Sequence, residues 1–162
     1  MTAPFSRAGF RPLLPAGIHP SDWAGLKRLC VDYFPTSATR PRLMSTLTML
    51  ARLVNEASLP SRLWIGGDLM TEKENPPTCS VAIVLVESIF NSLTGEQTDL
   101  FDWFRQSDLY DKYHCETYGI VIDAGRGDWE HLYKYWLNQY GLGRTGIGTG
   151  VVEILMPTLV SP

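Results

Sequence analysis

The chain has 162 residues, of which 44% are hydrophobic and 19% charged, and its formal net charge is −3. This length and composition predict one globular domain with a full hydrophobic core and exclude a low-complexity chain. The slightly acidic balance gives no general attraction for nucleic acid, so direct nucleic-acid binding is not expected. The longest strongly apolar run, residues 81–86, is too short to span a bilayer, so we expect no membrane association.

The three cysteines favour a reducing compartment. Cys30, Cys79 and Cys115 are widely spaced, odd in number and without metal-ligand spacing. We therefore expect buried free thiols and no metal site. The first residues lack the continuous apolar stretch of a signal peptide, and we expect the protein to be cytoplasmic.

The first third of the chain predicts a lead-in followed by two helices. Residues 1–20 hold four prolines and two glycines, which predicts an extended lead-in before a single domain over residues 21–162. Ser21 is the expected N-cap of a first helix that Pro35 ends. Pro41 begins a second helix whose apolar residues recur at the spacing of a helix packed on a sheet.

The remaining predicted elements are four strands and two helices. Strands are predicted at 62–69, 79–86, 114–123 and 149–156, and helices at 96–105 and from 128 to about 140. The run 81–86 does not alternate, which indicates a central strand buried on both faces. Thr94 and Gln97 have the spacing of a capping box. The order predicts an α/β (α+β) domain, a small mixed sheet with helices packed on it.

The most informative stretch is residues 64–85, WIGGDLMTEKENPPTCSVAIVL. A strand runs into a Gly-Gly turn, a polar and proline-rich segment follows, and a second apolar strand begins. Together with GFRPLLPAGIHPSDW (9–23) and YGLGRTGIGTGVVEI (140–154), this layout resembles a group of small, mostly uncharacterised bacterial nucleotidyltransferase-like proteins. The resemblance runs from about Gly9 to Ile154. It implies a nucleotidyltransferase-like sheet, with a Gly-Ser turn for a triphosphate and Asp-x-Asp for Mg²⁺.

The residues that the resemblance would make functional are replaced in this chain. The turn reads Gly66, Gly67 and Asp68, and the Asp-x-Asp positions are Thr78 and Ser80. Neutral hydroxyls are poor ligands for Mg²⁺, which prefers ionised oxygens. Asp68 would add repulsion toward phosphates, about 4 kcal/mol for two charges ~4 Å apart at an effective dielectric near 20. The sequence therefore predicts a degenerate motif that needs no cofactor.

A rebuilt acidic site is the alternative. Asp68 and Glu72 lie in the loop, and Glu116 lies in the strand where the resemblance implies a third carboxylate. If these three residues are catalytic, the protein is an active nucleotidyltransferase that uses Mg²⁺ and ATP to modify a protein or RNA. The competing interpretation is that they are ordinary loop and strand-edge charges.

Other matches to known motifs lack the required context. The letters G-x-G-x-x-G at 141–146 follow a helix and precede a strand, the reverse of a dinucleotide-binding turn. His114-Cys115-Glu116 has the H-x-E letters of a zinc deaminase, but no P-C-x-x-C follows.

Aromatic and acidic residues mix in the segment 99–111, DLFDWFRQSDLYD. Trp and Tyr are favoured interface anchors, so a partner-binding surface is predicted here; its residues are Trp103, Asp108, Tyr110 and Asp111. The aromatic residues of the helix from 128 instead favour core packing.

These observations lead to one main hypothesis, one rival, and a third possibility, a subunit that mainly stabilises a complex. The main hypothesis is a catalytically degenerate nucleotidyltransferase-fold protein that binds a macromolecular partner, most concretely a protein. An antitoxin-like role, or inhibition of a defence system by a phage or mobile element, is what the resemblance suggests. The rival is the active enzyme with the rebuilt site.

Overall fold

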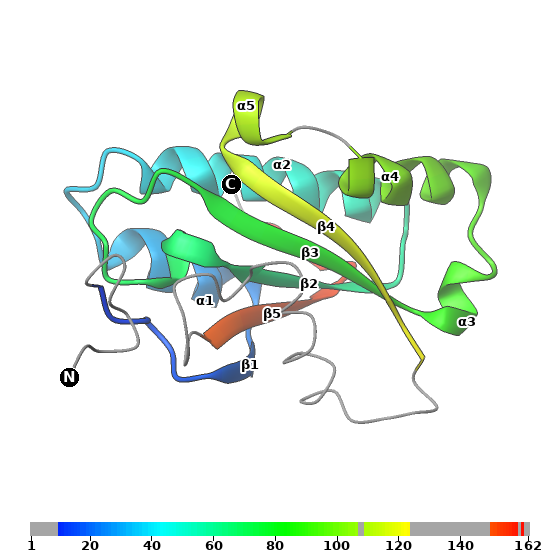
Figure 1. The fold of residues 1–162 in the computed structure, drawn as a ribbon, viewed down its shortest axis with the longest axis horizontal. Coiled ribbons are helices and arrows are strands. Elements are labelled where there is room, and N and C mark those ends of the chain that lie inside the picture. The colour runs from blue at the N-terminus through cyan, green and yellow to red at the C-terminus, as the bar shows by residue number, and fades with distance from the viewer. Residues whose placement is uncertain (1–9, 107–108, 124–149, 159, 161–162) are drawn as a thin grey trace.

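The structure is a computed structural model that describes residues 10–106, 109–123, 150–158 and 160, shown in Figure 1. Its elements in chain order are β1 (Gly17–Pro20), α1 (Trp23–Lys27), the π-helix η1 (Arg28–Asp32), α2 (Arg40–Glu56), β2 (Ser61–Gly66), the 3-10 helix η2 (Gly67–Met70), β3 (Cys79–Val86), α3 (Glu87–Phe90), α4 (Gly95–Gln106), α5 (Leu109–Tyr113), β4 (Cys115–Ile122) and β5 (Gly150–Met156).

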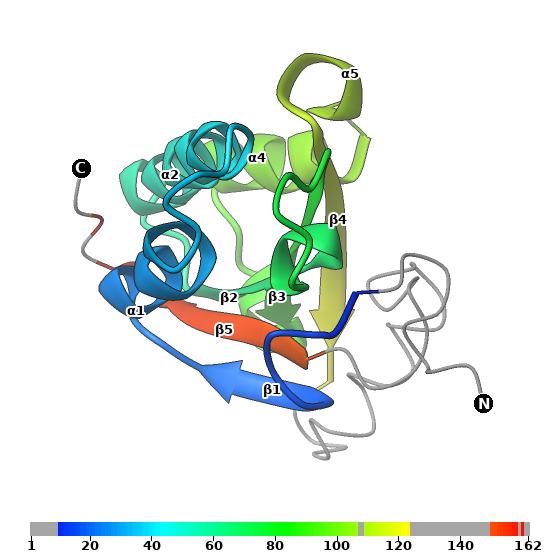
Figure 2. The same ribbon diagram turned by 90° about the vertical axis from the view of Figure 1, so that its left-hand side faces the viewer.

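The strands form one mixed sheet of five strands in the order β1-β5-β2-β3-β4. β1 is parallel to β5 and β3 is parallel to β4, whereas β2 is antiparallel to both β3 and β5. The helices α1, α2 and α4 cover one face of this sheet (Figures 1 and 2). The predicted α/β class, a small mixed sheet with helices packed on it, is confirmed.

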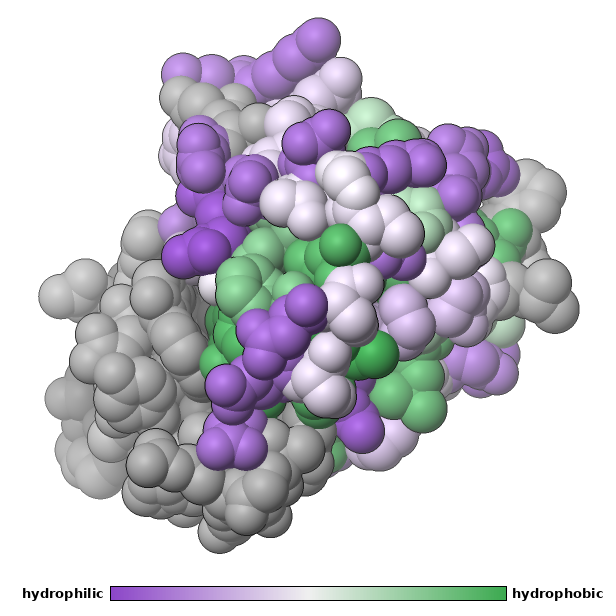
Figure 3. Space-filling model, turned by 90° about the vertical axis from the view of Figure 1, so that its right-hand side faces the viewer, coloured by the Kyte–Doolittle hydropathy of each residue, from purple (hydrophilic) through white to green (hydrophobic). Residues whose placement is uncertain are grey.

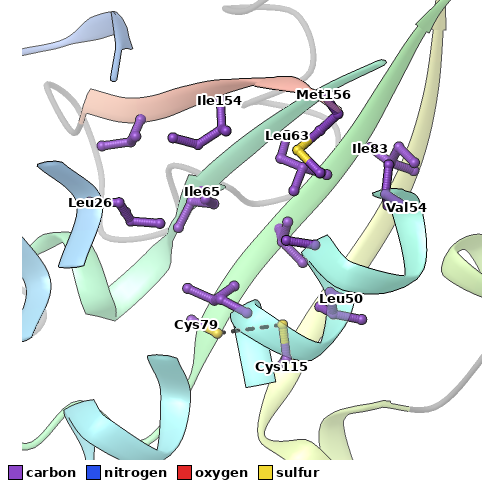
Figure 4. Packing of buried hydrophobic residues seen from close by; sticks show 14 of the residues in the cluster. Leu26, Leu50, Val54, Leu63, Ile65, Cys79, Ile83, Cys115, Ile154 and Met156 are labelled. Atoms are coloured by element: carbon purple, nitrogen blue, oxygen red, sulfur yellow. Dashed lines mark hydrogen bonds between the residues drawn. The ribbon is translucent and has the colours of Figure 1, made fainter. Parts of the chain in front are cut away.

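The main core lies between this helical layer and the sheet. Alternate residues of the strands point into it, including Leu63, Ile65, Ile83 and Ile154, and α2 contributes Leu50 and other residues one helical turn apart (Figure 4). The opposite face of the sheet carries a second apolar cluster of buried residues. Because both faces are buried, β3 has almost no alternation in burial, as its sequence predicted.

Several predicted boundaries are confirmed closely. β3 spans the predicted residues, α2 begins one residue before Pro41, and α4 lies within one residue of its predicted ends. The capping box is present, with the Gln97 N–H donating to Thr94 Oγ1 over 3.2 Å and the Thr94 N–H donating to Gln97 Oε1 over 3.0 Å.

Other expectations need correction. The last residues of the lead-in form the edge strand β1, which was not predicted, so the domain begins before residue 21. Asp22, not Ser21, caps the first helix, since its Oδ1 accepts a hydrogen bond from the Gly25 N–H over 2.7 Å. The strand expected to reach residue 69 ends at Gly66, where the chain turns into η2. The short helices α3 and α5 were not predicted, and the helix expected from residue 128 lies outside the described residues.

No helix in the described part of the chain has the length and apolarity that a bilayer span requires.

Candidate functional site

The predicted motif residues meet in one row across three strands. Gly66 in β2 pairs with Ser80 in β3, and Ser80 pairs with Glu116 in β4. All three therefore lie on the same face of the sheet, opposite the helical layer. Glu116, one of the three acids of the alternative site, is therefore the direct neighbour in β4 of Ser80, the second of the two Asp-x-Asp positions.

Ser80 occupies the centre of this row and is buried, with 3% of its surface exposed. Gly67 packs directly on it: a Cβ at Gly67 would lie 2.8 Å from Ser80 Oγ and 3.1 Å from the Ser80 backbone nitrogen. Gly67 also has a φ of 79°, which side chains rarely adopt. The turn is therefore closed onto the strand, with no room for a side chain between them.

The other motif residues have different surroundings. Asp68 is half-buried in η2, and its backbone carbonyl accepts a 2.7 Å hydrogen bond from Thr71 Oγ1. Thr78 is half-buried just before β3. Neither Thr78 nor Ser80 supplies an ionised oxygen, so the donor set at these two positions does not suit Mg²⁺.

The segment that follows η2 is held by a buried arginine, Arg40, at the start of α2. Its guanidinium donates hydrogen bonds of 2.6–3.0 Å to the backbone carbonyls of Cys30, Leu69, Thr71 and Lys73. The guanidinium carbon also lies 3.6 Å from the centroid of the Phe34 ring. Burial lowers the pKa of Arg40, and the nearby Cys30 and Glu74 oppose that shift.

The loop before α2 holds the next residues of the same segment. Thr36 Oγ1 donates to Glu74 Oε2 over 2.6 Å. Asn75 Oδ1 accepts hydrogen bonds from the Ala38 N–H over 2.7 Å and from Ser37 Oγ over 3.2 Å. Glu74 and Asn75 are therefore engaged within the chain.

The lead-in closes the segment from the other side. Pro12 and Thr71 form an isolated antiparallel bridge. The Leu13 N–H donates to the Met70 carbonyl and the Glu72 N–H donates to the Arg11 carbonyl, each over 2.8 Å. The polar loop of the motif is thus anchored on both sides.

The three acids of the alternative site have separate environments. Asp68 lies in η2, and Glu72 is exposed beside the lead-in. Glu116 is half-buried and accepts a 3.1 Å hydrogen bond from Tyr118 Oη. Among the described residues, no three His, Cys, Asp or Glu side chains gather in a group that could hold a metal ion.

The predicted partner-binding residues divide into two kinds. Trp103 is half-buried, packs against the main core, and meets the Phe104 ring edge-to-face at 5.9 Å. Tyr110 and Asp111, in α5, are exposed, and Tyr110 shows half of its surface. Asp108 lies outside the described residues.

A family model described as "Family of unknown function (DUF6932)" matches residues 8–155. The chain belongs to this family. The matched range begins within the lead-in and ends within β5, so it includes both the anchored segment and α5. No curated protein and no solved structure matches the chain.

Sequence reasoning missed the polar groups that this family member buries. Arg40 is one of them, and nothing in its sequence context distinguishes it from the exposed Arg42. The arginines between residues 40 and 62 do not form one basic surface, since Arg40 is buried and Arg62 pairs with Glu153 at 2.9 Å.

Glu153 also carried a sequence signal that went unused. It is the one charged residue of the apolar strand β5, and only 6% of its surface is exposed. Its carboxylate accepts hydrogen bonds from Arg62 Nη1 over 2.9 Å and from Trp64 Nε1 over 3.0 Å. A single acid inside an apolar strand predicts a buried carboxylate that accepts hydrogen bonds from neighbouring side chains.

The three thiols are buried and free, as expected. Burial raises the pKa of Cys30 to about 12. A hydrogen bond to Cys115 and burial raise the pKa of Cys79, and the two sulfur atoms lie 3.4 Å apart (Figure 4). Because the thiolate is the reactive form, Cys30 and Cys79 are poor nucleophiles.

Proposed function

We propose that this protein is a catalytically degenerate nucleotidyltransferase-fold protein that acts by binding a macromolecular partner, most concretely another protein. The resemblance of the sequence supplies the fold family. An antitoxin-like role, or inhibition of a bacterial defence system by a phage or mobile element, is the biological setting we propose, in the cytoplasm.

The observation that carries the proposal is the closed packing of Gly67 on Ser80. Transfer of a nucleotide depends on Mg²⁺ and on a turn whose N–H groups face a phosphate. In this chain a buried hydroxyl occupies the central strand position, and the turn lies against it. Compared with the Asp-x-Asp and Gly-Ser pattern that the resemblance implies, this arrangement attracts a metal ion less and leaves less space beside the strand.

The anchored loop supports the same proposal. Arg40 is a cation beside the motif, but its Nη atoms donate to backbone carbonyls and are not directed at a ligand. The side chains of Glu74 and Asn75 are also engaged within the chain, because they accept hydrogen bonds from Thr36 Oγ1 and from the Ala38 N–H. The polar residues next to the motif thus serve the structure of the loop.

The exposed residues of α5 support a binding role. Tyr110 and Asp111 present an aromatic ring and a carboxylate side by side in the chain, both exposed. Such a surface is suited to a basic protein, because the carboxylate attracts it and the ring contributes apolar contact area.

The test is affinity capture from the native host with the wild-type chain, Tyr110→Ala and Glu116→Gln. The proposal predicts a captured protein that is lost with Tyr110→Ala and retained with Glu116→Gln. Tyr110 is a cleaner probe than Trp103, whose removal would also disturb the core. Transfer of label from ATP labelled at its α-phosphate to the captured protein, abolished by Glu116→Gln, would instead establish the active enzyme.

A further inference from the structure

A groove lies between α1–η1 and α2. The helices α1 and α2 are neighbours in the helical layer (Figure 2). Its volume is about 410 Å³. Trp23 and Met44 form its buried floor, and Val31 and Met49 are half-buried on its walls. The groove is therefore apolar at its base while remaining open to solvent.

The side chains that line the groove from α2 form a continuous stripe. They recur at three- and four-residue intervals from Pro41 to Arg52. Eleven residue steps at about 1.5 Å each give a stripe of roughly 17 Å, or about three helical turns. A groove of this length between two helices can bind a third helix along its axis.

The two hydroxyls of the stripe do not make it polar. Ser45 Oγ donates to the Pro41 carbonyl over 3.1 Å, and Thr48 Oγ1 donates to the Met44 carbonyl over 2.9 Å. Both hydroxyl protons are directed to the backbone of their own helix. An apolar partner can therefore cover Ser45 and Thr48 without leaving a buried hydrogen-bond donor unsatisfied.

The charge of the groove has one sign. Lys27 of α1 and Arg52 of α2 are exposed and line it, and no Asp or Glu is among its described lining residues. Neither cation forms an ion pair within the described part of the chain. This local positive charge contrasts with the net charge of −3 for the whole chain.

We propose that the groove binds an acidic amphipathic helix of a protein partner. Leucine-like side chains at i, i+3 or i+4, and i+7 would lie against Met44, Met49 and Val31, and acidic residues at the flanks would face Lys27 and Arg52. Methionine suits such a seat because its flexible side chain adapts to different apolar shapes. The proposal rests on the proposed function in assuming a protein partner, but it concerns a surface separate in sequence from α5.

The test uses two synthetic helical peptides of about five turns, both with leucines along one face. One carries glutamates at the flanks and the other carries lysines at the same places. Binding to the full chain is followed by fluorescence anisotropy of the labelled peptide. We expect the acidic peptide to bind at least about tenfold more tightly than the basic one.

Variants of the groove locate the binding site. Lys27→Glu with Arg52→Glu should weaken the acidic peptide by about tenfold, because two attractive charges become repulsive. Met49→Glu should abolish binding, because it places a charge on the apolar wall. The matched control is Arg42→Glu, an exposed arginine of the same helix that does not line the groove, and it should change affinity less than about twofold.

Four results would overturn the proposal. The first is that the acidic peptide does not bind the wild-type chain, and the second is that both peptides bind equally well. The third is that the control variant loses as much affinity as the groove variants. The fourth is a dimer in sedimentation that Met49→Glu dissociates, which would make a second copy of the chain the occupant of the groove. A failure of the proposed function is distinguishable, because it would appear as nucleotide transfer or as partner capture insensitive to Tyr110→Ala, neither of which involves the peptides.

Discussion

The segment from Gly66 to Ser80 and the short helix α5 are both polar, but the chain uses their polar groups differently. In the segment, carbonyls and side chains are bonded to Arg40, to the loop before α2 and to the lead-in. In α5, Tyr110 and Asp111 are exposed to solvent. Polar groups engaged inside the chain build structure, whereas exposed ones remain available for a partner.

This contrast also applies to the arginines of α2. Arg40 is fully buried and bonded to four carbonyls, while Arg52 is exposed at the rim of the groove. The same residue type therefore has a structural role at one end of the helix and an available charge near the other.

The largest expected effect comes from Arg40→Ala. The substitution leaves several buried carbonyls without a donor and opens a cavity, so we expect the free energy of unfolding to fall by at least about 4 kcal/mol. That loss is a large part of the total stability of a single domain. Urea denaturation measures it, with Arg42→Ala as the matched control that should change stability by less than about 0.5 kcal/mol. A loss for Arg40→Ala no larger than that of the control would contradict the anchoring role of Arg40.

Gly67→Ala tests the closed packing of the turn. The new Cβ would lie too close to Ser80 Oγ and would require a strained φ, so we expect a loss of about 2 to 3 kcal/mol. Thermal or urea unfolding measures it. Gly95→Ala is the control, since a Cβ there meets nothing within 4 Å. Removing the hydroxyl with Ser80→Ala in the Gly67→Ala background should recover part of the loss, and the absence of any recovery would show that the contact does not matter.

A smaller change in the free energy of unfolding is expected when pH is raised, because the Cys30 thiol titrates. Its pKa is about 12 in the folded protein and 9.0 is the ordinary value, so the folded state holds the proton more tightly. The stabilisation is therefore complete below about pH 9 and is lost as pH rises toward 12. Between about pH 8 and pH 10 this group alone should lower the free energy of unfolding by about 1.4 kcal/mol. In urea denaturation, the free energy of unfolding of Cys30→Ala should depend less steeply on pH than that of the wild type. An equal pH dependence in both proteins would show that Cys30 is not the cause.

The smallest expected effect on stability comes from Tyr110→Ala. Its side chain is half exposed, so the free energy of unfolding should change by less than about 0.5 kcal/mol. If α5 is a partner surface, capture of the partner should nonetheless be lost. A variant that is as stable as the wild type and captures the same protein equally well would remove Tyr110 from the interface.

The parts of the fold that could be predicted are those whose signal is local. The unbroken apolar run gave β3, and the spacing of Thr94 and Gln97 gave the start of α4. β1 could not be predicted in this way, because its residues are GIHP and it becomes a strand only through pairing with β5. The non-local pairing supplies what the local sequence lacks.

The candidate site shows the same division. The row that Gly66 and Ser80 form with Glu116 depends on the pairing of β2, β3 and β4, but the positions of Gly66 and Ser80 in two successive strands followed from motif spacing. The anchoring by Arg40 did not, because it joins a helix start to a loop some thirty residues away through backbone carbonyls, which carry no sequence signature.

Calorimetric titration with ATP and with GTP, each in the presence and absence of Mg²⁺, distinguishes a degenerate motif from a working nucleotide site. We expect no metal-dependent heat of binding at millimolar nucleotide, because Ser80 and Thr78 lack ionised oxygens and the turn is closed on the strand. Saturable binding that requires Mg²⁺ and is lost with Glu116→Gln would contradict it and would establish a working nucleotide site.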